Sequence, residues 1–315
     1  MFDLFSIILT VMGLTLFEVI TSVDNAIINA HVLSTMGQKA RRWFLVWGLL
    51  IAVFVVRGLL PWLIVFVLNP QLGLVGALTA TFSEDPMVLH SIEMSKPILL
   101  VGGGIFMVFL FLHWLFLEPK YYGFRGEKTI EKNGIWFFAI VSILLSALVW
   151  LALEKNPLMA LGATIGSSLF FITHGFKQNA ESKEKDLLDK KKTASLSDLS
   201  KLFYLEVIDA TFSIDSVLGA FAFTLSVPLI LIGNGIGALV VRELTIKNVN
   251  KVANYKYLKN GAMYSIFFLG VIMIYDAFGG HIPEWVSPIV TFAVVGWFYW
   301  KSLKVMGKEV EGSPN

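Results

Sequence analysis

The first long segment of the chain, residues 4–33, reads LFSIILTVMGLTLFEVITSVDNAIINAHVL. About 20 mainly apolar residues are enough for a helix to cross the hydrocarbon core of a bilayer. A backbone segment of this length inside lipid must be helical, because only a helix satisfies its own hydrogen bonds there. The segment nevertheless carries two carboxylates, Glu18 and Asp24. It therefore predicts a membrane-spanning helix that buries acidic groups.

The composition of the whole chain supports the same class of protein. Of the 315 residues, 56% are hydrophobic and only 15% are charged, and the mean hydropathy is +0.72. Soluble domains carry about 25% charged residues. The absence of Cys excludes disulfides and thiolate metal sites. We predict an all-α polytopic membrane protein in the cell (plasma) membrane.

Apolar runs separated by polar segments define the expected spans. Nine runs are long enough to cross the membrane as helices. They lie near residues 4–33, 43–68, 97–117, 134–153, 157–175, 202–225, 228–246, 261–280 and 287–305. The segment 69–96 between the second and third runs is expected to be a solvated loop.

The distribution of Lys and Arg predicts the orientation. Loops that face the cytoplasm are enriched in these residues. The spans alternate in direction, and Lys301 and Lys304 at the end of the last run are counted with the C-terminal tail. All but four of the 25 Lys and Arg then fall on one side. Of those four, Lys96 and Lys155 fall on the other side, and Arg57 and Arg242 lie inside spans. This bias predicts that the N-terminus is outside and the C-terminus is in the cytoplasm.

A charged cytoplasmic linker divides the chain into two membrane regions. The linker covers residues 176–201 and contains the sequence KQNAESKEKDLLDKKKTASLSDLSK. Spans one to five precede it in residues 1–175, and spans six to nine follow it in residues 202–315. We interpret the linker as a solvated segment close to anionic lipid.

The two membrane regions contain an internal repeat. Residues 17–27 read FEVITSVDNAI, and residues 207–218 read VIDATFSIDSVL. A shift of 191 residues aligns the acids, serines and following polar residues. The aligned pairs are Glu18 with Asp209, Ser22 with Ser213, Asp24 with Asp215, and Asn25 with Ser216.

The predicted directions of the two copies are opposite. Arg57 also follows the first copy as Arg242 follows the second, each nine residues after a glycine. Inverted repeats are typical of transporters that bind substrate near the middle of the bilayer. The alternative is a duplication that was retained only for stability.

Oxygen ligands dominate the candidate site. A carboxylate at the bilayer centre costs about 2.5–3.5 kcal/mol, so such groups face a cavity, a cation or a proton. Oxygen-rich sites suit magnesium, calcium and manganese. The candidate metal ligands are Glu18, Asp24, Asn25, Glu206, Asp209 and Asp215, with Ser22, Ser213, Ser216, Arg57 and Arg242 in support.

The alternative role for the acids is structural. Arg57 lies deep in a span and is expected to pair with a carboxylate, whereas Arg242 lies near a span end and is expected to reach the interface. Acids six residues apart point to different faces of a regular helix. We therefore also expect spans one and six to unwind near Ser22–Asp24 and Ser213–Asp215, where Ser can bond to the backbone.

At these motifs the sequence resembles the TerC family of integral membrane proteins, within the LysE-like transporter group. The resemblance lies in an acid followed by Ser-x-Asp-Asn, and in Glu-x-x-Asp followed by Phe-Ser-x-Asp-Ser. The span number also fits, whereas the long loops and the linker diverge. The resemblance implies manganese export from the cytoplasm through these acids, and it brings a historical link to tellurium resistance.

We therefore expect a divalent-cation exporter, with manganese as the first choice, driven by proton entry in an alternating-access cycle. No cofactor is expected to be permanently bound. The expected partners are the bilayer, the metal ion and protons, but no nucleic acid. The alternatives are a transporter for calcium or another cationic solute, and a non-transporting scaffold or stress-resistance partner. An enzyme is disfavoured because no His, Lys or glycine-rich loop is placed for catalysis.

The repeat yields a direct test of this expectation. We predict that Asp24→Asn and Asp215→Asn each abolish metal tolerance in cells, because an amide supplies no charge to a divalent cation. Growth at high manganese measures tolerance, and membrane fractionation checks insertion. Full tolerance in both variants would remove these two acids from the metal pathway.

Overall fold

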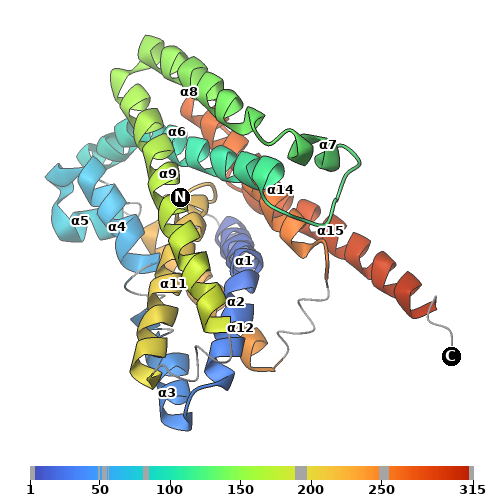
Figure 1. Cartoon of the computed structure of the whole chain (residues 1–315). Helices are drawn as coiled ribbons and strands as arrows, with labels where there is room; N and C mark the ends of the chain where they lie inside the picture. The colour runs from blue at the N-terminus through green and yellow to red at the C-terminus, as the bar shows by residue number, and fades with distance from the viewer. Residues whose placement is uncertain are drawn as a thin grey trace.

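The computed structural model describes residues 4–48, 50–51, 55, 57–80, 85–188, 197–247 and 255–311. The described residues form helices and connecting turns and contain no strand. The predicted all-α class is therefore confirmed for this part of the chain. Figure 1 shows the helices packed at several angles around one another, with the C-terminal end of α15 projecting from the bundle.

The first membrane region contains helices of very different length. In chain order they are α1 (Leu4–Thr21), α2 (Val23–Ser34), α3 (Gln38–Trp43), the π-helix η1 (Phe44–Gly48), α4 (Arg57–Leu68), the 3-10 helix η3 (Pro70–Leu72), α5 (Gly73–Thr79), α6 (Pro86–Leu117), α7 (Glu127–Lys132), α8 (Trp136–Lys155) and α9 (Pro157–Leu188).

The described part of the second region contains four long helices. They are α11 (Asp198–Ala220), α12 (Val227–Lys247), α14 (Leu258–Ala277) and α15 (Val286–Glu311). Helix α9 extends beyond the expected fifth span, so the first part of the predicted linker continues that helix. The predicted linker residues 189–196 lie outside the described residues.

Seven of the described helices are long and apolar enough to cross a membrane. They are α1, α6, α8, α9, α12, α14 and α15. An eighth span results if α4 and the following segment Pro70–Thr79, bent by 104°, count as one broken span. The predicted number of nine is thus too high by this criterion. The remaining expected span is α11, which is long enough but carries Glu206, Asp209 and Asp215.

The expected loop 69–96 is another correction. Much of it is helical, because α5 occupies Gly73–Thr79 and α6 begins at Pro86. Proline suits the first turn of a helix, and the Asp85 carboxylate caps α6 by accepting a hydrogen bond of 2.9 Å from the backbone N–H of Met87. Glu93 and Lys96 of this segment therefore lie on α6, in the part that precedes its most apolar stretch.

The expected helix breaks are only partly present. A one-residue interruption at Ser22 separates α1 from α2. In the second repeat, α11 runs without a break through Ser213–Asp215, so the prediction there is wrong. The Ser213 hydroxyl donates a 2.6 Å hydrogen bond to the carbonyl oxygen of Asp209 within the intact helix.

Helix α6 is the centre of the bundle. In its apolar stretch 78% of the residues are buried, against 22% in α8 and α15. Glycines allow close approach on two sides of α6. On the α9 side, a Cβ added to Gly162 would lie 2.6 Å from the carbonyl oxygen of Ile98. On the α14 side, a Cβ added to Gly104 would lie 2.9 Å from the carbonyl oxygen of Gly270.

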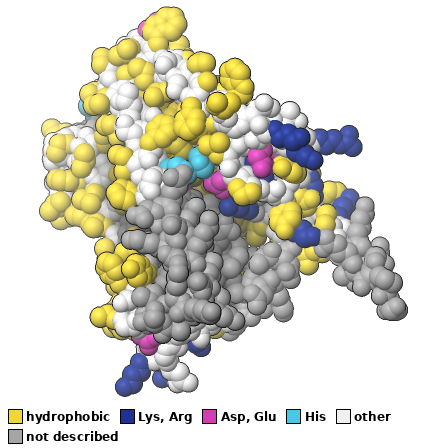
Figure 2. Space-filling model, in the orientation of Figure 1, with side chains coloured by type: hydrophobic (Ala, Val, Ile, Leu, Met, Phe, Trp, Pro, Cys, Tyr) yellow, Lys and Arg dark blue, Asp and Glu magenta, His cyan; other side chains and the backbone are white. Residues whose placement is uncertain are grey.

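The outer helices expose large apolar side chains. Figure 2 shows hydrophobic side chains over much of the described surface on one face, while Lys and Arg gather near α7 and along α15. On α8, Trp136, Ile143 and Trp150 are between 59% and 70% exposed. A soluble monomer rarely exposes so much apolar surface. Together with the long apolar helices, this surface identifies a helical membrane protein.

Contacts between loops fit the predicted grouping of the polar segments. Two segments expected in the cytoplasm meet where Lys259 Nζ lies 3.3 Å from the Glu118 carboxylate. On the other side, Lys155, which is expected outside, donates a hydrogen bond to the carbonyl oxygen of Phe278 near the expected outer end of the eighth span. The side of the membrane that each group faces stays a prediction.

The glycine contact between α6 and α9 predicts a large difference between two equivalent substitutions. Gly166→Ala should lower the free energy of unfolding by about 1–3 kcal/mol, because its Cβ would overlap the backbone of Gly102. Gly175→Ala on the same helix meets nothing within 4 Å and should be neutral or stabilising by up to about 1 kcal/mol. Thermal unfolding of both variants in detergent measures the difference. Equal melting temperatures would contradict the close packing.

Candidate functional site

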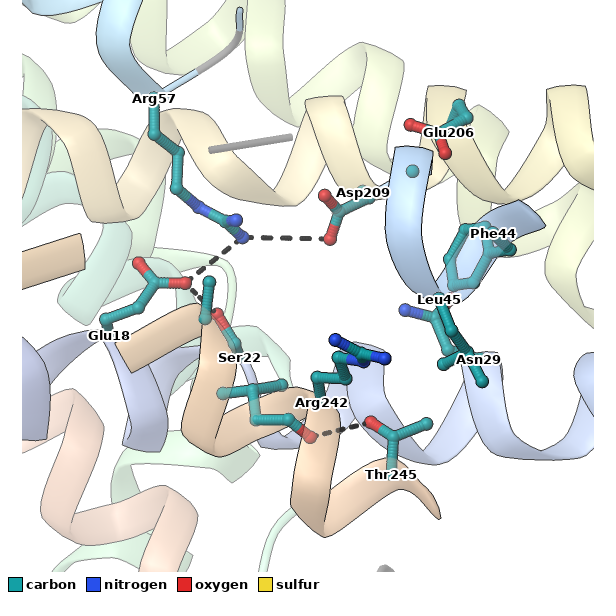
Figure 3. A pocket seen from close by; sticks show the side chains of 13 residues that line it. Glu18, Ser22, Asn29, Phe44, Leu45, Arg57, Glu206, Asp209, Arg242 and Thr245 are labelled. Atoms are coloured by element: carbon teal, nitrogen blue, oxygen red, sulfur yellow. Dashed lines mark hydrogen bonds and ion pairs between the residues drawn. The ribbon is translucent and has the colours of Figure 1, made fainter. Parts of the chain in front are cut away.

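A small cavity, here called the inner cavity, lies among α1, α2, η1, α4, α11 and α12. Its volume is about 50 Å³. One water needs roughly 10–15 Å³ of such space, so the cavity holds a few waters or an ion with part of its hydration shell. It is lined by Glu18, Ser22, Asn29, Phe44, Leu45, Gly48, Arg57, Glu206, Asp209, Ala238, Val241, Arg242 and Thr245 (Figure 3).

An ionic cluster joins both repeats on one side of the inner cavity. Arg57 Nη2 lies 3.1 Å from Glu18 Oε1 and 3.7 Å from Asp209 Oδ1. Glu18 is completely buried, and Arg57 and Asp209 are 4% and 9% exposed. Figure 3 shows the guanidinium pointing between the two carboxylates. The predicted pairing of Arg57 with an acid is confirmed, and this Arg contacts two acids at once.

Two hydroxyl groups complete the surroundings of the Glu18 carboxylate. Ser22, one turn further along the chain, donates a hydrogen bond of 2.7 Å to Oε1. Ser216 on α11 donates a hydrogen bond to Oε2. Residues four apart in a helix lie on the same face, which places Ser22 above Glu18. Both oxygens of the Glu18 carboxylate therefore accept hydrogen bonds from hydroxyl groups.

The helix packing brings α12 against the acidic part of α1. Gly233 and Gly237 are four residues apart on α12, and they face Leu14 and Glu18. A Cβ added to Gly237 would lie 2.6 Å from Glu18 Cβ. Small residues at this spacing let membrane helices approach closely. The sequence GNGIG therefore fixes one wall of the site.

The rest of the cavity presents polar atoms that lack partners. Within the described part of the chain, Glu206 Oε1, Asn29 Oδ1, Arg242 Nε and Arg57 Nε are buried without a hydrogen bond. In Figure 3, Glu206 lies beside Phe44, across the cavity from Glu18. Buried polar atoms are normally satisfied by protein or water. The cavity is thus suited to a polar occupant.

The structure brings together part of the predicted site. Glu18, Glu206 and Asp209 line the inner cavity, as do Ser22, Arg57 and Arg242 from the supporting set. Arg242 is half-buried and lines the cavity, whereas it was expected to reach the membrane interface.

Other predicted residues are placed differently or are not described. Asp215, Ser213 and Ser216 are not lining residues of the inner cavity. The side chains of Asp24 and Asn25 lie outside the described residues. In the part that is described, no three His, Asp or Glu side chains are grouped closely enough to hold a metal ion.

Sequence reasoning missed two polar residues of the cavity, Asn29 and Thr245. Asn29 follows Ser22 by seven residues, and Thr245 follows Arg242 by three. Both spacings keep the residues on one face of a helix. The same helix face, followed two turns beyond Ser22 and one turn beyond Arg242, therefore leads to these two residues.

Comparison with known proteins assigns the chain to a family. A family described as "Protein of unknown function (DUF475)" matches residues 23–308. The chain therefore belongs to the DUF475 family. No curated protein and no solved structure matches it.

Removal of the Arg57 guanidinium from the ionic cluster should destabilise the protein strongly. Arg57→Met should lower the free energy of unfolding by about 3–5 kcal/mol, because two buried carboxylates lose their counter-charge. Adding Glu18→Gln should restore part of the loss. Thermal unfolding in detergent measures both effects.

Arg242→Met is the matched control, since no carboxylate among the described residues forms an ion pair with Arg242. It should cost much less stability. The account of the cluster would be contradicted if Arg57→Met and Arg242→Met had the same effect.

Proposed function

We propose that this member of the DUF475 family exports a divalent cation, with Mn²⁺ as the first choice, through the inner cavity. The observation that carries the proposal is the fully buried Glu18 carboxylate, which shares Arg57 with Asp209. Ionisable residues inside membrane helices typically mark ion or proton pathways. The proposed location is the plasma membrane, with export from the cytoplasm.

A purely structural role explains the cluster less well. The desolvation of a buried ion pair offsets much of its attraction, and apolar residues of similar volume often stabilise a protein as well or better. The cluster also lies on a cavity with unsatisfied polar atoms rather than in a dry core. These features support a site that exchanges its occupants.

The charges of the cavity suggest how a cation is exchanged. Glu18, Glu206 and Asp209 face Arg57 and Arg242, which leaves one net negative charge when all five are ionised. In our proposal a divalent cation displaces the Arg57 guanidinium from the two carboxylates that it now bridges. When the cation leaves, Arg57 returns to them. Arg57 thus acts as a tethered counter-ion that prevents tight trapping of the cargo.

Export also needs an energy source. Moving a 2+ ion outward against an inside-negative potential costs about 4.6 kcal/mol per 100 mV. Carboxylates bind either metal or protons, so proton entry is the simplest driving reaction. In this proposal the two halves form inverted repeats around the cavity, and alternating access exposes it first to the cytoplasm and then to the outside.

The chemistry of the lining favours a hard cation. The lining offers carboxylate, hydroxyl and amide oxygens but neither His nor Cys, and such ligands suit manganese, calcium and magnesium. The resemblance to the TerC family favours manganese among these. Pockets for small organic ligands measure about 300–1,000 Å³, so a cavity of about 50 Å³ disfavours a basic amino acid.

Flux measurements on the purified protein test the proposal. Reconstituted in vesicles, the wild-type protein should move Mn²⁺, as reported by a trapped metal-sensitive dye. Glu18→Gln and Asp209→Asn should each reduce the flux at least tenfold, because each removes a charge that binds the cargo. The exposed Glu154 lies outside the cavity, so Glu154→Gln should leave the flux unchanged.

The same vesicles separate the alternatives. A calcium transporter would move Ca²⁺ in preference to Mn²⁺ and would still lose flux in both cavity variants. A scaffold would move none of Mn²⁺, Ca²⁺ or Mg²⁺. Wild-type flux in both cavity variants would contradict the proposed role of the inner cavity.

A further inference from the structure

A second and larger cavity, here called the outer cavity, lies at the other end of α11 and α12. Its volume is about 250 Å³. Lys96, Asp276 and Glu284 are among its lining residues, and Lys96 Nζ lies 2.9 Å from Asp276 Oδ2. Like the inner cavity, it holds more carboxylates than cationic groups among its lining residues. This surplus of negative charge favours a cation.

The same two helices connect both cavities. Helix α11 contributes Asp209 to the inner cavity, and Phe221 at its C-terminal end lines the outer one. Ser226 immediately before α12 lines the outer cavity, and Ala238 lines the inner one. Each pair is 12 residues apart, which corresponds to about 18 Å along a helix. A continuous path between the cavities would thus run alongside α11 and α12.

One side of α12 leads from the outer cavity to the inner one. Ser226, Ile230, Asn234 and Ala238 follow one another at intervals of four residues, which keeps them on one side of the helix. Ile230 and Asn234, which lie between the cavities, are both completely buried. Ile230 is apolar, whereas Asn234 places an amide in this buried section.

The polar atoms of the Asn234 side chain are buried and unsatisfied within the described part of the chain. Neither its Oδ1 nor its Nδ2 has a hydrogen-bond partner among the described residues. Asn69 is buried to a similar degree, but its Nδ2 donates to Ser95 Oγ at 2.9 Å and to the carbonyl oxygen of Val65. Burying an amide without partners is unfavourable, so its retention between two charged cavities points to a ligand that it meets transiently.

We propose that the inner and outer cavities are the two ends of one cation path, and that Asn234 supplies a ligand oxygen midway between them. The inference rests on the proposed function and extends it to the exit route. An amide oxygen is a hard ligand for Mn²⁺, Ca²⁺ or Mg²⁺. Because it is neutral, it holds the ion more weakly than a carboxylate and lets it move on.

Substitution of Asn234 separates a transport role from a structural one. Asn234→Leu removes two unsatisfied polar atoms at similar size, so the melting temperature should stay unchanged or rise. Mn²⁺ flux into vesicles should nevertheless fall at least tenfold, while Mn²⁺ binding to the detergent-solubilised protein, measured by calorimetry, stays as in the wild type. Asn69→Leu is the comparison for stability and should lower the melting temperature.

A charged variant adds a second kinetic signature. Asn234→Asp places a carboxylate where the path needs a weak ligand, so the concentration of Mn²⁺ for half-maximal flux and the maximal flux should both fall. Wild-type flux in Asn234→Leu would overturn the proposal.

Cysteine labelling tests the path without assuming the cargo, because the chain contains no native Cys. Ser226→Cys should react with a membrane-impermeant thiol reagent from the outside, and Thr245→Cys from the cytoplasmic side. Asn234→Cys should react from both sides as access alternates. If the wild-type protein moved no divalent cation but Asn234→Cys still reacted from both sides, the path would stand and the proposed cargo would fail. No reaction of Asn234→Cys from either side would overturn the path.

Discussion

The arrangement of this protein depends on one ionic interaction, the contact of Arg57 with Glu18 and Asp209 inside a membrane bundle. Buried charges of one sign would repel each other and would be costly in a low-dielectric interior. The guanidinium compensates both carboxylates and draws together α1, α4 and α11, which come from both halves of the chain. The two hydroxyls on Glu18, from Ser22 and Ser216, add hydrogen bonds that an isolated ion pair would lack.

Close helix contacts at glycines surround this interaction. Charges that are stable only in a fixed geometry need rigid neighbours. Glycines on α12 bring it against α1 at Leu14 and Glu18, and glycines on α6 and α9 hold the centre of the bundle. The inner cavity lies at the edge of this packed region, where polar atoms without partners remain. The site therefore combines close packing on one side with a polar cavity on the other.

Much of this could be predicted from the sequence, since long apolar runs fix the helices and a deep Arg must find an acid. Two features could not. The hydroxyl of Ser213 can either break its helix or bond back to Asp209, and that choice depends on neighbours that are distant in sequence. The sharp bend after Leu68 joins two apolar segments. Hydropathy alone does not distinguish such a bent pair from a straight span that is followed by a loop. Of the site, the acids and Arg57 are visible as charges in apolar runs, and Asn29 follows from the helical periodicity of the motif. Asn234 carries no charge and stands out only when its burial and its lack of partners are known.

In the proposed cycle a divalent cation takes the place of Arg57 between Glu18 and Asp209. The most direct measurement is a structure of the purified protein crystallised with Mn²⁺, in which anomalous scattering locates the metal. We expect a manganese peak bound by carboxylate oxygens of Glu18 and Asp209, with the Arg57 guanidinium withdrawn from both. Manganese bound elsewhere, with Arg57 still bridging the two carboxylates at saturating metal, would contradict it.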